Sequence, residues 1–438
     1  MDTVILGASE VAHLSSVDPV TGRIDGSDLL NRKKNIGEDI GIHIRNGIIQ
    51  RMAPNEEIQH EWGDIRPDTH QKMHITPEGN RWINTNGKAI VPGFVDSHTH
   101  LLWDGDRSHE MALKIEGKTY QDLSKLGMGI STTVKATRNS DISRLIEIGK
   151  NRIQRARSMG TTTMEAKSGY GLDTDTELRL LSAAKSLEDL HDAPALHHTW
   201  LGAHAYPPDV HHQSWNEHLV DEQLPAIIEQ NIATSVDVFC EPGWFDLEFT
   251  EDIVHSSMRK GLRSRLHVDE FVDGGGLNLA AELRVDSADH AGYSSDDARE
   301  KASKAGVNTG FLPGTPYVHG DPMTNAIEQC INEGWKWSMA TDFNPNCRSL
   351  SIPFVGSLAV HRMRIPPIAA LAAVTVNAAS TLDTPLGVGQ LIEGGVADLN
   401  ILQTESADGW CLMPGDNPVD FSIHHTSLIG YTSNTNSN

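Results

Sequence analysis

Cysteine is scarce in this sequence, and the few that occur form no pattern. Four cysteines are spread over 438 residues, at Cys240, Cys330, Cys347 and Cys411. Their separation excludes a Cys-x-x-Cys redox or zinc motif, and their number excludes a disulfide-rich secreted scaffold. The chain also lacks an apolar run of membrane-spanning length and the basic, apolar start of a signal peptide. We therefore expect a cytoplasmic protein with no membrane partner.

Positive charge is also in short supply. Lys and Arg number 36 against 59 Asp and Glu, for a formal net charge of −23. This balance disfavours nucleic acid and anionic membranes as partners. An anionic substrate would need locally placed Arg, Lys or Tyr. The length fits one large α/β barrel with a smaller domain.

Eight apolar, strand-like segments alternate with helical patterns between residues 91 and 384, and each ends in polar or glycine-rich residues. This alternation is typical of a parallel α/β sheet. A doubly wound open sheet would need a Gly-x-Gly-x-x-Gly turn after a strand, and the sequence has none. We therefore predict a (β/α)8 TIM-like barrel with its reacting groups at the carboxyl ends of the strands. The segments are AIVPGFVDSHTH, TTTMEAKSGYG, HHTWLGAHA, SVDVFCEPG, SRLHVDE, VDSADHAG, VNTGFLPGT and WSMATDFNP.

The two ends of the chain show short strands and turns instead. Asn46-Gly47 is a hairpin-turn signal, and LGVGQLIEGGVADLNIL, near the C-terminus, is typical of turn, strand, turn and strand. We predict that residues 1–90 and 385–438 form one small β-sandwich-like domain, with the polar stretch 50–85 as an exposed excursion. The barrel domain then spans 91–384.

One predicted barrel helix has clear boundaries. In DISRLIEIGKNRIQRARSMG, apolar residues recur at helical spacing, and Gly160 is the expected stop.

The first barrel strand, VPGFVDSHTH, ends in two histidines. Residues i and i+2 of a strand share a face, so His98 and His100 point the same way. Later strands end in His267 and Asp342. Three imidazoles and one carboxylate suit Zn²⁺ or iron, and such an ion lowers the pKa of a bound water. The alternatives are a solvated strand end for the first pair and a buried structural pair for the second.

Three further polar side chains end predicted strands, namely His204, Glu270 and His290. They are candidates for acid–base chemistry. The alternative is that Glu270 and His290 only orient the ligands.

At this point the residues resemble the imidazolonepropionase family of the amidohydrolase superfamily. The similarity spans about residues 90–390. It implies the hydrolysis of 4-imidazolone-5-propanoate to N-formimidoyl-L-glutamate, the third step of histidine degradation. It also implies a homodimer and one divalent metal per chain, zinc or iron (Fe²⁺ or Fe³⁺), bound by His98, His100, His267 and Asp342. The motifs are PGFVDSHTH, THLLWDGDR, MEAKSGYGL, LGAHA, DVFCEPGWF, HVDE, LPGT and ATDFNP.

The resemblance also suggests roles for individual residues. Asp342 would hold the attacking water and take its proton. Glu270 would bind the ring nitrogens and pass a proton to the departing nitrogen. His204 and His290 would stabilise charge on the carbonyl oxygen.

The substrate's propanoate group needs a counter-charge in this acidic protein. Arg107 is the predicted clamp, because a guanidinium can grip a carboxylate at two points. The resemblance adds Tyr120 and Tyr170 to the pocket. The alternative for Arg107 is an ordinary ion pair in a surface loop.

Two departures from the family pattern bear on the substrate. One is LPGTPYVHGDP, where Pro316 and His319 alter the loop after the seventh strand. The other follows TDFNP. After TDFNP the family usually continues with Gly and then Ser or Thr, whereas this chain reads Asn346-Cys347-Arg348. We expect Asn344, Asn346 and Cys347 to contact the substrate and to affect which ring substituent fits. Two enzymatic alternatives stay open: a sibling cyclic amidohydrolase acting on a related imidazolidinone or thio-imidazolidinone propanoate, and an amidine deaminase or iminohydrolase. A non-enzymatic binding protein of this fold is the third alternative.

Overall fold

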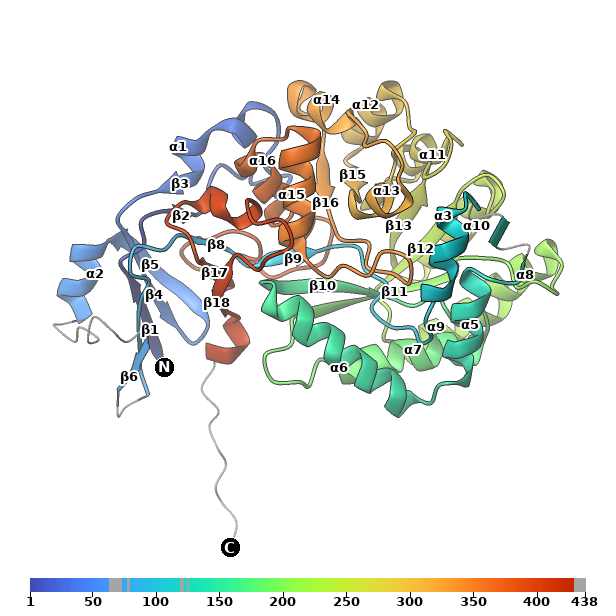
Figure 1. The fold of residues 1–438 in the computed structure, drawn as a ribbon, viewed down its shortest axis with the longest axis horizontal. Helices are drawn as coiled ribbons and strands as arrows, with labels where there is room; N and C mark the ends of the chain where they lie inside the picture. Colours follow the sequence, from blue (N-terminus) through green and yellow to red (C-terminus); the bar gives the residue numbers. More distant parts are fainter. Residues whose placement is uncertain (63–72, 77–78, 119–121, 124–125, 429–438) are drawn as a thin grey trace, which may run out of the picture.

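The computed structural model describes residues 1–62, 73–76, 79–118, 122–123 and 126–428. It contains an eight-stranded parallel barrel beside two smaller five-stranded sheets (Figure 1). No helix in these described ranges is long and apolar enough to cross a membrane.

The barrel strands follow one another in chain order, each parallel to its predecessor. All eight overlap the predicted segments, so the barrel prediction is confirmed. The first and last strands meet through the Thr99–Phe343 bridge and the bond from His100 N to Phe343 O, 2.8 Å. The strands are β9 (Phe94–Asp96), β10 (Thr161–Lys167), β11 (Ala195–Ala203), β12 (Ser235–Cys240), β13 (Arg263–Val268), β14 (Ser287–His290), β15 (Asn308–Phe311) and β16 (Trp337–Met339).

Helices lie between successive barrel strands and cover the outside of the barrel (Figure 1). The predicted helix is α6 (Ile142–Ser158). The Asp141 side chain caps it by accepting from Arg144 N at 2.8 Å, and Gly160 follows its end with φ +89°. The others are α3 (Met111–Ile115), α5 (Ile130–Asn139), α7 (Thr174–Ser186), α8 (His212–His218), α9 (Leu224–Gln230), α10 (Leu247–Arg259), α11 (Gly276–Leu283), α12 (Asp296–Ala305), α13 (Gly314–His319), α14 (Ala326–Glu333), α15 (Ile352–Met363), α16 (Pro367–Ala373) and α17 (Val376–Ala379).

The two smaller sheets combine both ends of the chain. One has the order β5-β4-β1-β7-β6, and the other has the order β18-β17-β8-β2-β3. Both contribute to one apolar core, which includes Ile5 and Ile42 from the first sheet and Ile90 and Leu399 from the second. This agrees with the predicted sandwich-like unit. The strands are β1 (Asp2–Leu6), β2 (Val11–Ala12), β3 (Ile36–Gly37), β4 (Ile40–Arg45), β5 (Ile48–Pro54), β6 (Met73–Ile75), β7 (Arg81–Asn84), β8 (Ile90–Pro92), β17 (Leu399–Leu402) and β18 (Val419–Ile423).

Two local predictions for the termini are wrong. The stretch 50–85 is more than an exposed excursion, because it holds α2 (Asn55–Trp62) and strands β6 and β7. Strand β7 pairs with β1 and buries Trp82 and Ile83. Two apolar residues in a polar stretch are too few to show a strand pattern in the sequence. The first strand expected after residue 386 does not form. Leu391 instead lies buried in a loop, and its backbone N donates a hydrogen bond to His13 O at 3.0 Å.

Candidate metal centre and active-site pocket

Four predicted ligands converge at the carboxyl-terminal end of the barrel. His98 and His100 follow β9, His267 lies near the end of β13, and Asp342 follows β16. All four side chains are buried. Asp342 Oδ1 lies 3.6 Å from His98 Nε2 and 3.7 Å from His100 Nε2. Ligand atoms of the three histidines also lie within 4.8 Å of one another. The structure therefore brings the whole predicted set together.

This cluster has the properties of a divalent-metal site. The Nε2 atoms of His98 and His267 are buried and have no hydrogen-bond partner among the described residues. A buried polar atom without a partner is costly, and a bound cation would satisfy both nitrogens. Burial also lowers the pKa values of His98 and His100 well below the usual range. Their rings are therefore neutral, which is the form that binds metal.

Buried carboxylates orient two of these rings. His98 Nδ1 lies 2.7 Å from Asp289 Oδ2, and His267 Nδ1 lies 3.0 Å from Asp237 Oδ1. A hydrogen bond at Nδ1 fixes the tautomer that leaves Nε2 available to a metal. Mutation of such supporting groups typically weakens metal binding about 10–100-fold.

Beneath the ligands, a lysine holds two acidic side chains inside the barrel. Lys167 Nζ lies 2.5 Å from Asp237 Oδ2 and 2.8 Å from Glu165 Oε2. Burial alone would lower the pKa of Lys167, but Asp237 and Glu165 raise it overall. Burial would likewise raise the pKa of Asp237, which His267 and Lys167 hold well below its usual value. Asp237 therefore stays ionised and can fix the His267 ring.

This network was not predicted from the sequence. A usable signal is the presence of two charged residues, Glu165 and Lys167, at i and i+2 of a predicted barrel strand. Such residues share a face, which in a barrel strand is the interior.

Several strand ends carry backbone strain. Asp269, His290 and Asp342 have φ values of +49°, +70° and +49°. Non-glycine residues adopt this region rarely, and such residues cluster at active sites. The Thr315 hydroxyl donates to Asp342 Oδ2 and leaves Oδ1 directed at the histidines.

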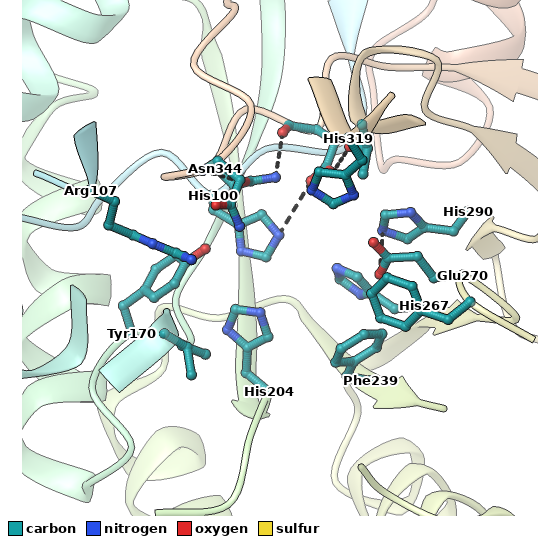
Figure 2. A pocket seen from close by; sticks show the side chains of 15 residues that line it. His100, Arg107, Tyr170, His204, Phe239, His267, Glu270, His290, His319 and Asn344 are labelled. Carbon is teal, nitrogen blue, oxygen red and sulfur yellow. Dashed lines mark hydrogen bonds and ion pairs between the residues drawn. The ribbon is translucent and has the colours of Figure 1, made fainter. Parts of the chain in front are cut away.

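A pocket opens over the ligand cluster, with different chemistry on its two sides (Figure 2). Arg107 and Tyr170 lie on one side, and Glu270 and His290 lie on the other. His204 lies between them and stacks on His100, with ring centroids 5.1 Å apart. A wall with a guanidinium group and a phenol ring thus faces a wall with a carboxyl group and an imidazole across the ligand cluster.

Arg107 is buried and already engaged by a carboxylate. Its Nε and Nη2 atoms donate to Glu110 at 3.0 and 2.8 Å, and Glu110 also accepts from Gly129 N at 2.8 Å. The alternative prediction placed Arg107 in a surface loop. This is wrong, because Arg107 is 7% exposed and lines the pocket. The Nε/Nη2 edge serves Glu110, so a substrate carboxylate would meet the outer end of the guanidinium.

His204 offers an acceptor to the pocket. Its Nδ1 lies 2.8 Å from the Gly169 carbonyl oxygen, which can only accept. Burial lowers the pKa of His204 to about 4, so the ring is neutral. With the proton on Nδ1, Nε2 carries a lone pair. His204 is therefore better suited to accept a hydrogen bond from a ring N–H than to stabilise an oxyanion. The oxyanion role was the one predicted from the sequence.

Glu270 and His290 form a close pair on the opposite wall. Glu270 Oε2 lies 3.7 Å from His290 Nε2. Burial, followed by the charges of Asp342 and Glu241, raises the pKa of Glu270 well above its usual value. Burial lowers the pKa of His290 well below its usual value. Both shifts favour the uncharged forms of the Glu270 carboxyl group and the His290 imidazole.

Sequence comparison identifies the family. No protein-family model matches the chain. The chain is 35% identical over 430 residues to the imidazolonepropionase of Haloarcula marismortui, covering 98% of this chain and 96% of that protein. It is also 35% identical over 394 residues to the imidazolonepropionase of Parabacteroides distasonis, covering 89% and 91%.

The chain belongs to the imidazolonepropionase family. Solved structures with the same fold include a 5-methylcytosine deaminase from Klebsiella pneumoniae, with a TM-score of 0.68, 19% identity and 97% coverage of both chains. Another is an enamidase described as a member of the amidohydrolase superfamily, with a TM-score of 0.57, 13% identity and coverage of 97% of this chain and 94% of that one. At such identities these structures show the fold alone.

The loop that departs from the imidazolonepropionase pattern reaches the pocket in part. Asn344 and Asn346 line it. Asn344 Oδ1 accepts from Asn346 N at 2.7 Å, and Asn346 Oδ1 accepts from Lys114 Nζ at 3.0 Å. Cys347 is not among the lining residues, and its thiol points to Thr341 O at 3.8 Å. Tyr120 lies outside the described residues.

Glu241, which follows β12, is engaged by the backbone of the next loop. Its carboxylate accepts from the backbone amides of Glu270, Phe271 and Val272 at 2.9, 3.0 and 3.1 Å. It therefore shapes the loop that carries Glu270.

Two aromatic pocket residues were not predicted from the sequence, namely Phe239 in β12 and Phe271 in the loop after β13. Their ring centroids lie 6.4 Å apart. His319 enters the pocket from the end of α13 (Figure 2). A second cavity of about 350 Å³ adjoins the pocket at Glu270 and His319. The sequence singled out His319 only as part of a changed loop after the seventh strand, because GTPYVH is too short to show the helical periodicity of α13.

Proposed function

We propose that this chain hydrolyses 4-imidazolone-5-propanoate to N-formimidoyl-L-glutamate. The reaction takes place at a single active site in each chain, which holds one metal ion. One observation carries the proposal. Arg107 and Tyr170 lie on one side of the pocket and Glu270 lies on the other, with the four metal ligands between them. A carboxylate-bearing side chain would lie toward the first wall, and the reacting ring would lie over the cluster.

Three neutral imidazoles and one carboxylate favour zinc or iron. A divalent ion held by His98, His100, His267 and Asp342 would supply Lewis acidity, which brings the pKa of a water towards neutrality and polarises a carbonyl. We infer a single ion because the Glu241 carboxylate is engaged by backbone amides.

The side chains around the cluster can move the required protons. Asp342 lies beside the ligand histidines, and its carboxylate is placed to take a proton from the attacking water. The water oxygen joins the lactam carbonyl carbon, and the carbon–nitrogen bond breaks. Glu270 carries a proton that it can deliver to the departing ring nitrogen. His204 accepts a hydrogen bond from the ring and so helps to orient it.

The substrate's carboxylate would be bound by the outer end of Arg107 and the Tyr170 hydroxyl. Asn344 and Asn346 would border the ring on the third side. Cys347 would lie behind these two asparagines and would not contact the substrate.

Product analysis tests the proposal against its alternatives. Metal-analysed protein is mixed with freshly generated 4-imidazolone-5-propanoate, ring absorbance is followed, and the product is identified by mass. N-formimidoyl-L-glutamate is the expected product. Ammonia release would indicate a deaminase or iminohydrolase, and sulfide release from a thio-ring analogue, with no turnover of the imidazolone, would indicate a sibling substrate. The homodimer and the cytoplasmic location stay predictions that light scattering and cell fractionation can check.

A further inference from the structure

A second histidine–carboxylate cluster lies at the opposite end of the barrel from the active site. It comprises Asp398, His424 and His425, whose ligand atoms lie within 4.8 Å of one another. The two histidines line a cavity of about 770 Å³ together with Ala195, the first residue of β11. The proposed catalytic groups follow the carboxyl ends of the strands, so this cluster belongs to a separate place in the fold.

Strand pairing explains why these side chains meet. Strands β17 and β18 are antiparallel, with Leu399 opposite Ile423. The next residues outward are Asp398 and His424, which are therefore cross-strand neighbours. His425 begins the following 3-10 turn (His425–Leu428), and its backbone N donates to Asp398 Oδ1 at 2.7 Å.

The donor atoms are spaced almost as a small metal ion requires. Asp398 Oδ1 lies 2.9 Å from His425 Nδ1 and 3.9 Å from His424 Nε2. Bonds of about 2.0–2.2 Å in a tetrahedral zinc site place neighbouring donor atoms roughly 3.4 Å apart. Shifts of about half an ångström would complete this geometry. The His424 ring is held by its other nitrogen, with Nδ1 at 2.6 Å from Thr426 Oγ1.

Two buried carboxylate oxygens indicate that a cation is needed here. Asp398 Oδ2 is buried and accepts no hydrogen bond from any described residue. The same is true of Oδ1 of Asp192, which lines the same cavity and has φ +61°. Three cationic groups lie near these carboxylates. Arg81 and the Met1 ammonium group line the same cavity, and the ammonium group donates to Asn46 Oδ1 at 2.8 Å. Arg157 interacts electrostatically with Asp192 and Asp398, and its Nη2 donates to Ser422 O at 3.3 Å. Within the described chain it forms no ion pair with either carboxylate.

We propose that Asp398, His424 and His425 bind a structural divalent cation of the zinc class, separate from the catalytic ion. Two imidazoles and one carboxylate favour Zn²⁺ over Mg²⁺ or Ca²⁺, which prefer all-oxygen ligands. Asp192 or a water would supply the fourth ligand. The His425 carbonyl oxygen also packs against Gly47, where any added Cβ would clash with it. A bound ion therefore ties β17, the end of β18 and the Asn46-Gly47 hairpin together.

The decisive experiment removes the two sites separately and counts metal. Wild-type protein and variants are loaded with Zn²⁺, freed of excess by gel filtration and measured by mass spectrometry. We expect two ions per chain in the wild type, one in H424Q/H425Q and one in H98Q/H100Q. The matched control is H211Q/H212Q, an adjacent pair of exposed histidines, which should keep two. An H424Q/H425Q protein that holds as much Zn²⁺ as the wild type overturns the proposal.

A second readout guards against variants that fold poorly. Co²⁺ bound to H98Q/H100Q should give the visible absorption of a tetrahedral site, and adding Asp398→Asn to that variant should abolish it. H424Q/H425Q should keep its hydrolase activity, because neither histidine touches the pocket. Its Tm should no longer rise with the second equivalent of Zn²⁺. Loss of activity in step with the lost ion would contradict a purely structural role.

Discussion

Replacing Lys167 with methionine tests whether the buried charge network supports the metal centre. Methionine keeps most of the apolar stem and removes the charge. Glu165 would retain Arg265 at 3.2 Å, and Asp237 would retain His267 at 3.0 Å. Both carboxylates would nonetheless lose the cation that lies 2.8 and 2.5 Å from them.

The expected loss of stability is large. Removing one partner from a buried ion pair costs about 3–5 kcal/mol, because the remaining charge stays buried. For 438 residues, the entropy of unfolding is about 0.9 kcal/mol per kelvin at roughly 2.1 cal/mol/K per residue. The Tm of Lys167→Met should therefore fall by about 3–5 °C. The affinity for the catalytic metal should fall about 10–100-fold, because Asp237 would no longer hold His267 firmly.

Calorimetry of metal-loaded protein measures the first effect, and competition with a chelator of known affinity measures the second. Lys150→Met is the control, since Lys150 is exposed on α6 and should change neither quantity. A Lys167→Met protein with wild-type Tm and wild-type metal affinity would refute the reasoning.

Three further outcomes are expected. Glu270→Gln should keep its metal but lose about 100-fold or more in kcat, because the amide cannot deliver a proton; near wild-type turnover would exclude that role. Arg107→Lys should raise KM for the carboxylate-bearing substrate by about 10–100-fold with a smaller effect on kcat, and an unchanged KM would rule out the clamp. Removing the metal with a chelator should abolish turnover and Zn²⁺ or Fe²⁺ should restore it, whereas full activity of metal-free protein would exclude metal-assisted hydrolysis.

The barrel and its metal ligands were predictable because local sequence carries them. The predicted barrel segments alternate with helical patterns and end in polar or glycine-rich residues. The i, i+2 spacing of His98 and His100 places both rings on one face. The cap and stop of α6 are equally local signals.

The remaining features depend on long-range pairing. Lys167 and Asp237 come from strands that are not neighbours in the sheet, so their contact requires the closed barrel. Glu165 and Lys167 could have been singled out as inward-facing charges, but their partners could not. Trp82 became part of a core only because β7 pairs with β1.

The central claim is that water attacks the lactam carbonyl carbon over a single metal centre in this pocket. The most direct measurement is a single turnover of 4-imidazolone-5-propanoate in ¹⁸O-labelled water, with mass spectrometry of the product. The account predicts N-formimidoyl-L-glutamate with one ¹⁸O in the newly formed carboxylate, and loss of this reaction in H98Q/H100Q. Label in a formyl group, release of ammonia, or no reaction by the fully metallated protein would contradict it.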